Sequence, residues 1–376
     1  MRILVINWQD IKNPLGGGAE VHMHEIFSRL ASKGHEVDMI VSQFPGSPNE
    51  EVIDGINVHR RGGRNLFNFY VRGMYRWLRA SKEFDVVVDD INKIPFFTPS
   101  FVKEPLAAIV HHFFGGTIFK ETNPLFAGYV YLTESMVPSI YSRIPFVAVS
   151  ESTRKELLRK GIKGSMIEVV SNAVDSSLYR LSPVPPDKQT IGYLGRIKKY
   201  KSVDHLIKAF AMVAGKFPGA ELLIVGDGDN IDGLKELARK LRVESRVKFT
   251  GKVSDEEKVR LLQRMTFLVN PSAKEGWGLT VIEANACGRP VIAADVPGLR
   301  DSVLDNKTGL LYEYGNIEAL ANKIESFLSS ERSTREFGEV ATQWASRFTW
   351  DNSADKMESF LEKVAAKQFS SKVQSI

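Results

Sequence analysis

The sequence predicts an α/β protein with two doubly wound domains, and three observations carry this prediction. Strand-like runs rich in Val, Ile and Leu alternate with helical patterns along all 376 residues. Most runs lack polar alternation, as expected for parallel strands covered by helices on both faces. The segment LSPVPPDKQT (181–190) separates two such series, and its three prolines predict a linker. We therefore expect a first domain over 1–180 and a second over 181–349, with ligands in a cleft beyond the carboxyl ends of the strands.

Each element follows from its own pattern. Apolar runs predict first-domain strands at 3–7, 37–42, 56–60, 85–90, 107–112, 145–150 and 167–171. Similar runs predict second-domain strands at 190–195, 220–226, 246–251, 266–272, 290–295 and 309–313. Helical periodicity predicts helices at 19–33, 152–160, 202–216, 231–241, 255–264, 279–287 and 317–329. A last helix over 350–367 is expected to pack back onto the first domain.

Composition excludes several classes of protein. Hydrophobic residues make up 43% and charged residues 25%, which excludes disordered, collagen-like and coiled-coil chains. The single cysteine, Cys287, excludes a disulfide framework and a cysteine-rich metal site. The net charge of +5 is spread over both halves, which disfavours a nucleic-acid partner. No apolar run reaches the roughly 18–20 residues that span a bilayer, and MRILVINW is typical of a first strand, so we expect a cytoplasmic protein.

A glycine-rich loop, GGGAE, opens the first expected helix. Gly16, Gly17 and Gly18 allow a ligand to approach the backbone closely, and a helix N-terminus favours an anion. A nicotinamide-type fingerprint needs a third glycine where this chain has Val21, which disfavours dinucleotide binding. A flexible loop without a ligand is the alternative.

The basic loop GRIKKYKS follows the first strand of the second domain. Arg196 and Lys201 would lie at the carboxyl end of that strand, where a guanidinium fork and a mobile ammonium group can converge on a diphosphate. A solvated basic loop is the alternative.

The most specific segment is PSAKEGWGLTVIEANACGRPVIAAD (271–295). Glu275, Gly276 and Gly278 precede a helix that begins near Leu279, and Glu283 follows Glu275 by eight residues. Free amides at the helix start can hold a phosphate, and the two carboxylates can accept hydrogen bonds from sugar and ribose hydroxyls. Two solvated surface glutamates are the alternative.

Taken together, these motifs resemble the retaining glycosyltransferases of family 4, which have the GT-B fold. The resemblance covers almost the whole chain. Besides the three motifs above, it includes VSES (149–152), SNAVD (171–175), IVGDGD (224–229), VKFTGKVS (247–254) and FTWDNSADKMESFLEKV (348–364). It implies transfer of a sugar from a UDP- or GDP-sugar, with retained configuration, to a hydroxyl acceptor held by the first domain, in envelope glycan or glycolipid synthesis.

The resemblance also implies roles for individual residues. Arg196 and Lys201 correspond to the pair that neutralises the donor diphosphate. Glu283 corresponds to the ribose ligand and Glu275 to the ligand of the transferred sugar, and His111 to a histidine near the scissile bond. Further donor contacts are implied for Gly16, Gly17, Gly18, Gly226, Gly228, Lys252, Val253, Gly276, Gly278, Leu279 and Thr280.

Departures from the family pattern and other readings leave some points open. His112 replaces the usual Asp after the histidine, so a structural role for His111 stays open, and Ala173 replaces a glycine. The DGD sequence Asp227–Asp229 could be taken for a metal motif, but positive charge and a helix dipole meet the needs of a diphosphate, so we expect no metal and no cofactor. An epimerase, a phosphorylase and a non-catalytic nucleotide-sugar sensor are the alternative functions.

A basic stretch distinguishes the first domain. From Arg60 to Lys82 there are seven basic residues and no acidic one. On a helix over 65–82, an apolar stripe containing Phe67 and Met74 lies beside a stripe of Arg72, Arg76 and Arg79, with Trp77 nearby. Such a helix predicts contact with the anionic inner membrane surface, whereas an ordinary helix packed on the sheet is the alternative.

Overall fold

The computed structural model describes residues 1–92, 94–120, 122–182, 186 and 189–369. The chain forms two compact units, one comprising 1–172 with the residues from 350 onward and the other comprising 173–349. Residues 173–180 belong to the second unit because Val174 pairs with Thr349 and Tyr179 contacts Glu283. Half of the linker predicted over 181–190 lies outside the described residues, because 183–185, 187 and 188 are not described.

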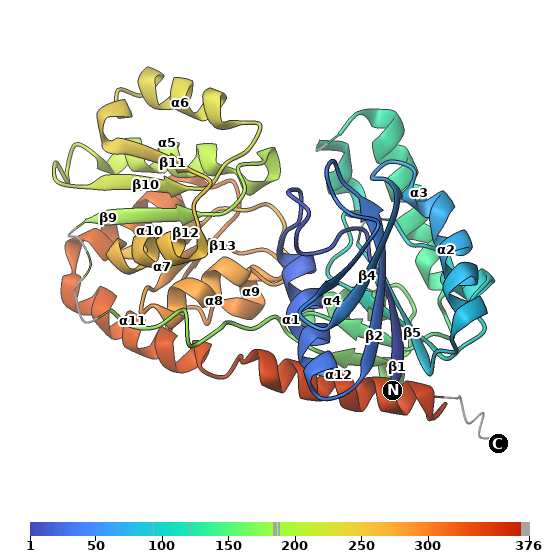
Figure 1. Ribbon diagram of the computed structural model, residues 1–376. Helices are drawn as coiled ribbons and strands as arrows, with labels where there is room; N and C mark the ends of the chain where they lie inside the picture. Colours follow the sequence, from blue (N-terminus) through green and yellow to red (C-terminus); the bar gives the residue numbers. More distant parts are fainter. Residues whose placement is uncertain (93, 121, 183–185, 187–188, 370–376) are drawn as a thin grey trace. The chain divides into compact units, whose positions relative to one another are not determined.

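The first unit is built on an eight-stranded sheet (Figure 1). The strand order is β3-β4-β2-β1-β5-β6-β7-β8, and every neighbouring pair except β3–β4 is parallel. The strands are β1 Arg2–Ile6, β2 Glu36–Gln43, β3 Glu50–Ile53, β4 Ile56–Gly63, β5 Val86–Ile91, β6 Leu106–Val110, β7 Phe146–Ala148 and β8 Ile167–Val169.

An antiparallel hairpin at one edge of this sheet was not among the predicted elements. Strands β3 and β4 are joined by Asp54 and Gly55, whose φ angles are 46° and 82°. Two consecutive left-handed residues make the tight hairpin turn that matches strand twist, and Asp-Gly is a favoured sequence for it.

Five α-helices cover the first sheet: α1 Gly18–Ser32, α2 Phe67–Ser81, α3 Pro124–Ile140, α4 Glu151–Arg159 and α12 Trp350–Ala365. Helix α12 lies alongside α1 (Figure 1). Arg29 donates to Asp351 at 2.8 Å, and Lys33 and His35 contact Glu358 at 2.5 and 2.7 Å. Helix α3 was not predicted.

Helix α2 corrects part of the membrane hypothesis. Phe67, Val71, Met74 and Leu78 are buried in the core of the first unit. Phe67 and Met74 therefore cannot anchor in lipid, because a side chain packed on the sheet has no surface left to offer. Trp77 remains half exposed.

The second unit has a six-stranded, wholly parallel sheet with the order β11-β10-β9-β12-β13-β14. Its strands are β9 Thr190–Leu194, β10 Glu221–Val225, β11 Val247–Gly251, β12 Phe267–Asn270, β13 Val291–Ala294 and β14 Gly309–Tyr312. The strand order reverses between β9 and β12, which is where open α/β sheets bind ligands. The predicted α/β class with two doubly wound sheets is confirmed.

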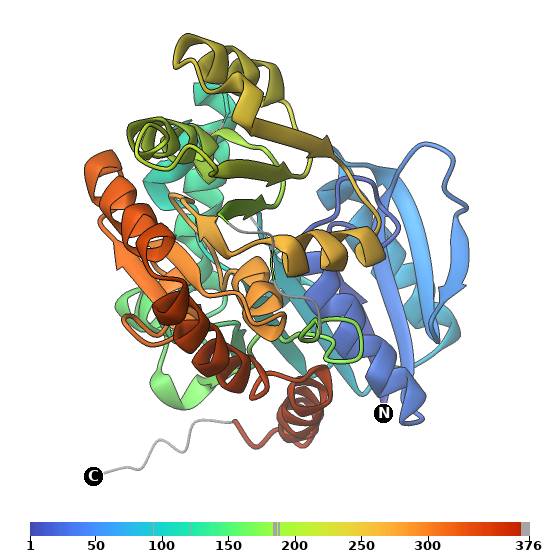
Figure 2. The same ribbon diagram turned by 90° about the vertical axis from the view of Figure 1, so that its left-hand side faces the viewer.

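The helices of the second unit are α5 Val203–Val213, α6 Ile231–Lys240, α7 Asp255–Arg264, α8 Leu279–Ala286, α9 Leu299–Ser302, α10 Ile317–Ser329 and α11 Glu331–Ala345. Helices α5 and α10 lie side by side (Figure 2), and α11 packs on α8. Helix α11 was not predicted. In the described part of the chain, no helix has the length and apolar character needed to cross a membrane.

Candidate active site

Two loops meet at the switch point of the second sheet. Because β9 pairs with β12, the loop after β9 and the loop after β12 leave the same edge of the sheet side by side. The amide of Ala273 donates to the carbonyl of Tyr200 at 2.8 Å, which joins the two loops. The sheet thereby brings together the basic loop and the Glu275 segment, two motifs that are far apart in the sequence.

Lys201 and Glu275 form an ion pair at this junction. Lys201 Nζ lies 2.5 Å from Glu275 Oε1, and the side chains are only 17% and 15% exposed. The Ser272 hydroxyl donates to the same carboxylate oxygen at 2.8 Å. Burial alone would lower the pKa of Lys201, but the Glu275 carboxylate outweighs it and raises the pKa above its ordinary value. Lys201 is therefore a fixed positive charge at neutral pH.

Glu283 is buried on α8 and has two partners. The Tyr179 hydroxyl donates to Glu283 Oε1 at 2.9 Å, and Lys258 Nζ lies 3.2 Å from the same oxygen. Burial, followed by the negative charge of Glu283, raises the pKa of Tyr179, so the phenol remains a hydrogen-bond donor. Both of these contacts go to the same carboxylate oxygen, Oε1.

Glycines hold the neighbouring loops in close contact. A Cβ on Gly226 would lie 2.0 Å from the carbonyl oxygen of Gly195, and a Cβ on Gly228 would lie 2.1 Å from that of Ile197. The amides of Gly195 and Ile197 donate to the carbonyls of Val225 and Asp227 at 3.0 and 2.9 Å. Gly226 and Gly228 thus serve first to let the loops after β9 and β10 touch.

The remaining predicted donor residues of this unit differ in exposure. Gly278 has a φ of 88° and is the N-cap of α8, and a Cβ there would lie 2.8 Å from Leu299. Arg196 and Lys252 are exposed. Val253, Gly276, Leu279 and Thr280 are partly exposed.

The acidic residues of the DGD sequence have local partners. Asp227 accepts from the amide of Gly228 at 2.7 Å, and Asp229 pairs with Lys198 at 2.7 Å. Among the residues that the structure describes, no group of three or more His, Cys, Asp or Glu side chains is arranged to hold a metal ion.

The glycine loop of the first unit lies at the corresponding switch point, between β1 and β5. Gly16 and Gly17 are partly buried and Gly18 is exposed. The amide of Gly17 donates to Glu20 Oε2 at 2.6 Å, which ties the loop to the first turn of α1. Burial raises the pKa of Glu20 above its ordinary value.

His111 follows β6 in the same unit and is buried. Its Nε2 lies 2.9 Å from Asp90 Oδ1, at the end of the neighbouring strand β5. Burial opposes protonation, but the charges of Asp90 and Glu20 raise the pKa of His111 overall. The ring of His22 lies edge-on to His111 at 5.3 Å, and burial lowers the pKa of His22 to about 3. His22 is therefore neutral at pH 7, and its ring lies beside that of His111.

Three residues that contact the predicted site residues were not identified from the sequence. Asp90 contacts His111, and Lys258 and Tyr179 contact Glu283. Asp90 carried a signal, because Asp89 and Asp90 end an otherwise apolar buried strand, VVVDD. A charge in such a position needs a partner. Lys258 and Tyr179 carried no signal, because neither lies in a motif and both meet Glu283 only through the fold.

Comparison with known families and proteins gives consistent matches. The family described as "Glycosyltransferase Family 4" matches residues 16–178, and "Glycosyl transferases group 1" matches residues 180–344. A D-inositol 3-phosphate glycosyltransferase of Rhodococcus erythropolis is 33% identical over 54% of this chain and 50% of its own length. The chain thus spans about half the length of that relative. A glycogen synthase of Mycobacterium tuberculosis is 25% identical over 94% of this chain and 92% of its own.

Solved structures show the same fold. Sucrose-phosphate synthase from Thermosynechococcus elongatus matches with a TM-score of 0.83 and 21% identity, over 97% of this chain and 99% of that one. HepE of Anabaena, in complex with UDP-glucose, matches with a TM-score of 0.75 and 20% identity, over 96% and 100%.

Proposed function

Because the chain belongs to the family 4 glycosyltransferases and has their GT-B fold, we propose that it transfers a sugar from a nucleotide-sugar donor to a hydroxyl acceptor. The observation that carries this proposal is the partly buried Lys201–Glu275 pair at the switch point of the second sheet. The complex of HepE with UDP-glucose supports a UDP-sugar as donor.

The proposed chemistry uses positive charge on the leaving group. As the bond from the sugar to the diphosphate breaks, negative charge builds on the phosphate, and Lys201 together with Arg196 stabilises it. Glu275 accepts hydrogen bonds from the sugar hydroxyls and keeps Lys201 charged. Glu283 accepts from the ribose hydroxyls. Two cations at the diphosphate make a divalent metal unnecessary, so the proposed reaction is independent of metal.

Retention of configuration follows from the transfer of the acceptor's hydroxyl proton to the departing phosphate. The departing phosphate accepts the proton of the acceptor hydroxyl on the face of the sugar that the phosphate leaves, so the new bond forms on that face. His111, whose Nε2 lies 2.9 Å from Asp90, is proposed to donate to the transferred sugar, and Gly16, Gly17 and Gly18 to approach the donor phosphate. The proposed acceptor is a hydroxyl of an envelope glycan or glycolipid.

Release of nucleotide from a panel of UDP- and GDP-sugars, in excess chelator, tests this proposal. The wild-type protein should release nucleotide slowly from one donor, because water replaces the missing acceptor. Arg196→Ala is the decisive variant: the side chain is exposed, so its loss should leave the fold intact and lower the rate roughly 100-fold or more.

Lys199→Ala is the matched control, since Lys199 is an exposed cation of the same loop with no proposed role. Equal rates in the Arg196 and Lys199 variants would contradict the diphosphate assignment. Turnover that stops in chelator and returns with manganese would contradict metal independence.

A further inference from the structure

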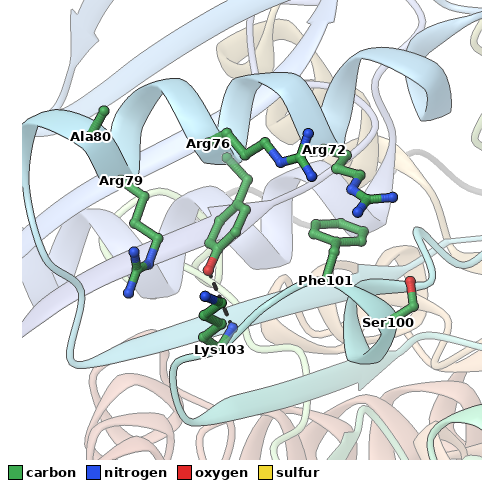
Figure 3. Close-up of a pocket in the computed structure, with 8 residues that line it drawn as sticks. Arg72, Arg76, Arg79, Ala80, Ser100, Phe101 and Lys103 are labelled. Atoms are coloured by element: carbon green, nitrogen blue, oxygen red, sulfur yellow. Dashed lines mark hydrogen bonds between the residues drawn. The ribbon is translucent and has the colours of Figure 1, made fainter.

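A cavity of about 450 Å³ opens beside helix α2 in the first unit. Figure 3 shows the arginines of α2 on one side of it and the segment around the short 3₁₀ helix Thr98–Ser100 on the other. Its lining residues are Arg72, Tyr75, Arg76, Arg79, Ala80, Ser100, Phe101 and Lys103. Four of the eight carry a positive charge and none a negative one.

Most of this charge is not neutralised by the protein. Arg79 pairs with Glu104 at 2.6 Å, and the Tyr75 hydroxyl donates to the same carboxylate. In the described ranges of the chain, no carboxylate forms an ion pair with Arg72, Arg76 or Lys103. Three unpaired cations that line one cavity favour a ligand with at least one full negative charge, such as a phosphate group.

An apolar stripe continues from the cavity around the exposed side of α2. At about 100° per residue, Phe69, Trp77 and Tyr70 follow the three arginines around the helix, and the buried residues lie opposite. Phe69 is 80% exposed, Trp77 50% and Tyr70 46%. A second cavity of about 310 Å³ lies among these rings, and the Arg61 guanidinium stands 5.7 Å from the Trp77 ring.

We propose that this face of α2 binds an anionic membrane surface, with a phospholipid headgroup phosphate in the cavity of Arg72, Arg76 and Lys103. The charge excess alone would fit any polyanion. The exposed aromatic stripe beside it favours the boundary between headgroups and acyl chains, where cations meet phosphate while rings enter the apolar layer. The inference does not depend on sugar transfer, and it replaces the buried Phe67 and Met74 by Phe69, Tyr70 and Trp77 as the membrane-facing residues.

Vesicle sedimentation of the full chain tests the proposal. The protein should sediment with vesicles of phosphatidylcholine and phosphatidylglycerol, stay in solution with phosphatidylcholine alone, and be released at about 1 M salt, where the screening length falls to about 3 Å. The double variant R72Q/R76Q should lower the partition coefficient about 30-fold, since each basic residue at an anionic leaflet accounts for about a fivefold change.

The double variant K155Q/R159Q is the matched control, because it removes the same charge from exposed positions of α4 in the same unit. It should bind like the wild type, and F69S should weaken binding without changing the salt dependence. Equal binding to both vesicle types would overturn the proposal. So would equal losses in R72Q/R76Q and K155Q/R159Q, which would reveal only a general charge effect, or binding of R72Q/R76Q at the wild-type level. Nucleotide release measured without vesicles keeps this result separate from the test of sugar transfer.

Discussion

Replacing Glu275 by glutamine would leave the ammonium group of Lys201 without its carboxylate partner. The two side chains are 17% and 15% exposed and 2.5 Å apart. Removing one partner of a buried pair costs about 3–5 kcal/mol, and the remaining exposure favours the lower end, about 3 kcal/mol. For a unit of the size of residues 173–349, each kcal/mol lowers the melting temperature by about 2–4 °C. Glu275→Gln should therefore lower the melting temperature of that unit by roughly 6–12 °C.

The double variant K201M/E275L separates this effect on stability from catalysis. Both charges are then replaced by apolar groups of similar length, which is often nearly neutral for stability. We expect it to unfold within about 1 kcal/mol of the wild type, yet to release no nucleotide, because the diphosphate has lost a cation. Calorimetry at pH 7.5 in a phosphate-free buffer measures the unfolding transitions of the wild type, Glu275→Gln and K201M/E275L.

The stabilisation by the Lys201–Glu275 pair depends on pH in a defined direction. The folded pKa of Lys201 lies above its ordinary value of 10.5, so the stabilisation is complete below 10.5 and is lost as pH rises through the folded pKa. The loss of unfolding free energy caused by Glu275→Gln should thus be constant from pH 7 to 9. A double variant no more stable than Glu275→Gln would refute the reasoning, since the cost would then not come from an unpaired charge.

Three further predictions concern Glu283, His22 and Gly228. Glu283→Gln should weaken binding of the nucleoside diphosphate, measured by titration calorimetry, at least about 10-fold with a smaller change in kcat. Glu257→Gln on α7, whose carboxylate lies 3.2 Å from Arg260, should leave this binding unchanged. His22, with a pKa of about 3 in the folded state and 6.5 as its ordinary value, stabilises fully above pH 6.5 and less as pH falls toward 3. The difference in unfolding free energy between wild type and His22→Gln should therefore shrink by about 2 kcal/mol from pH 7.5 to pH 5, and an unchanged difference would mean that His22 titrates normally. Gly228→Ala places a Cβ 2.1 Å from the carbonyl oxygen of Ile197 and should cost about 3 kcal/mol in urea unfolding, whereas Gly215→Ala, with nothing within 4 Å, should be tolerated.

Much of the fold could be predicted from the periodicity of apolar residues. Apolar runs located every parallel strand, because strands covered on both faces have no polar alternation. The hairpin of β3 and β4 was overlooked although Asp54-Gly55 marks it. Helix α2 shows a firmer limit: periodicity found its apolar stripe, but only the packing shows that Phe67 and Met74 face the core.

In the candidate site, local motifs identified individual residues but did not show which of them contact one another. Motif order singled out Lys201 and Glu275, yet their pairing depends on β9 lying beside β12, which no local pattern specifies. The roles first expected for Gly226 and Gly228 were contacts near the nucleotide. The structure shows the additional reason for glycine there, a backbone approach that only the folded loops create.

The return of α12 to the first unit has a consequence for the order of synthesis. Residues 173–349, whose ends are joined by the Val174–Thr349 bridge in the folded protein, are synthesised before Trp350–Ala365. The second unit is therefore synthesised in full while α1 still lacks α12 as its neighbour. Until then Arg29 and Lys33 have no Asp351 or Glu358 to contact, and the apolar face that α12 covers stays exposed. The first unit, which begins the chain, therefore receives its last helix only after the second unit has been synthesised.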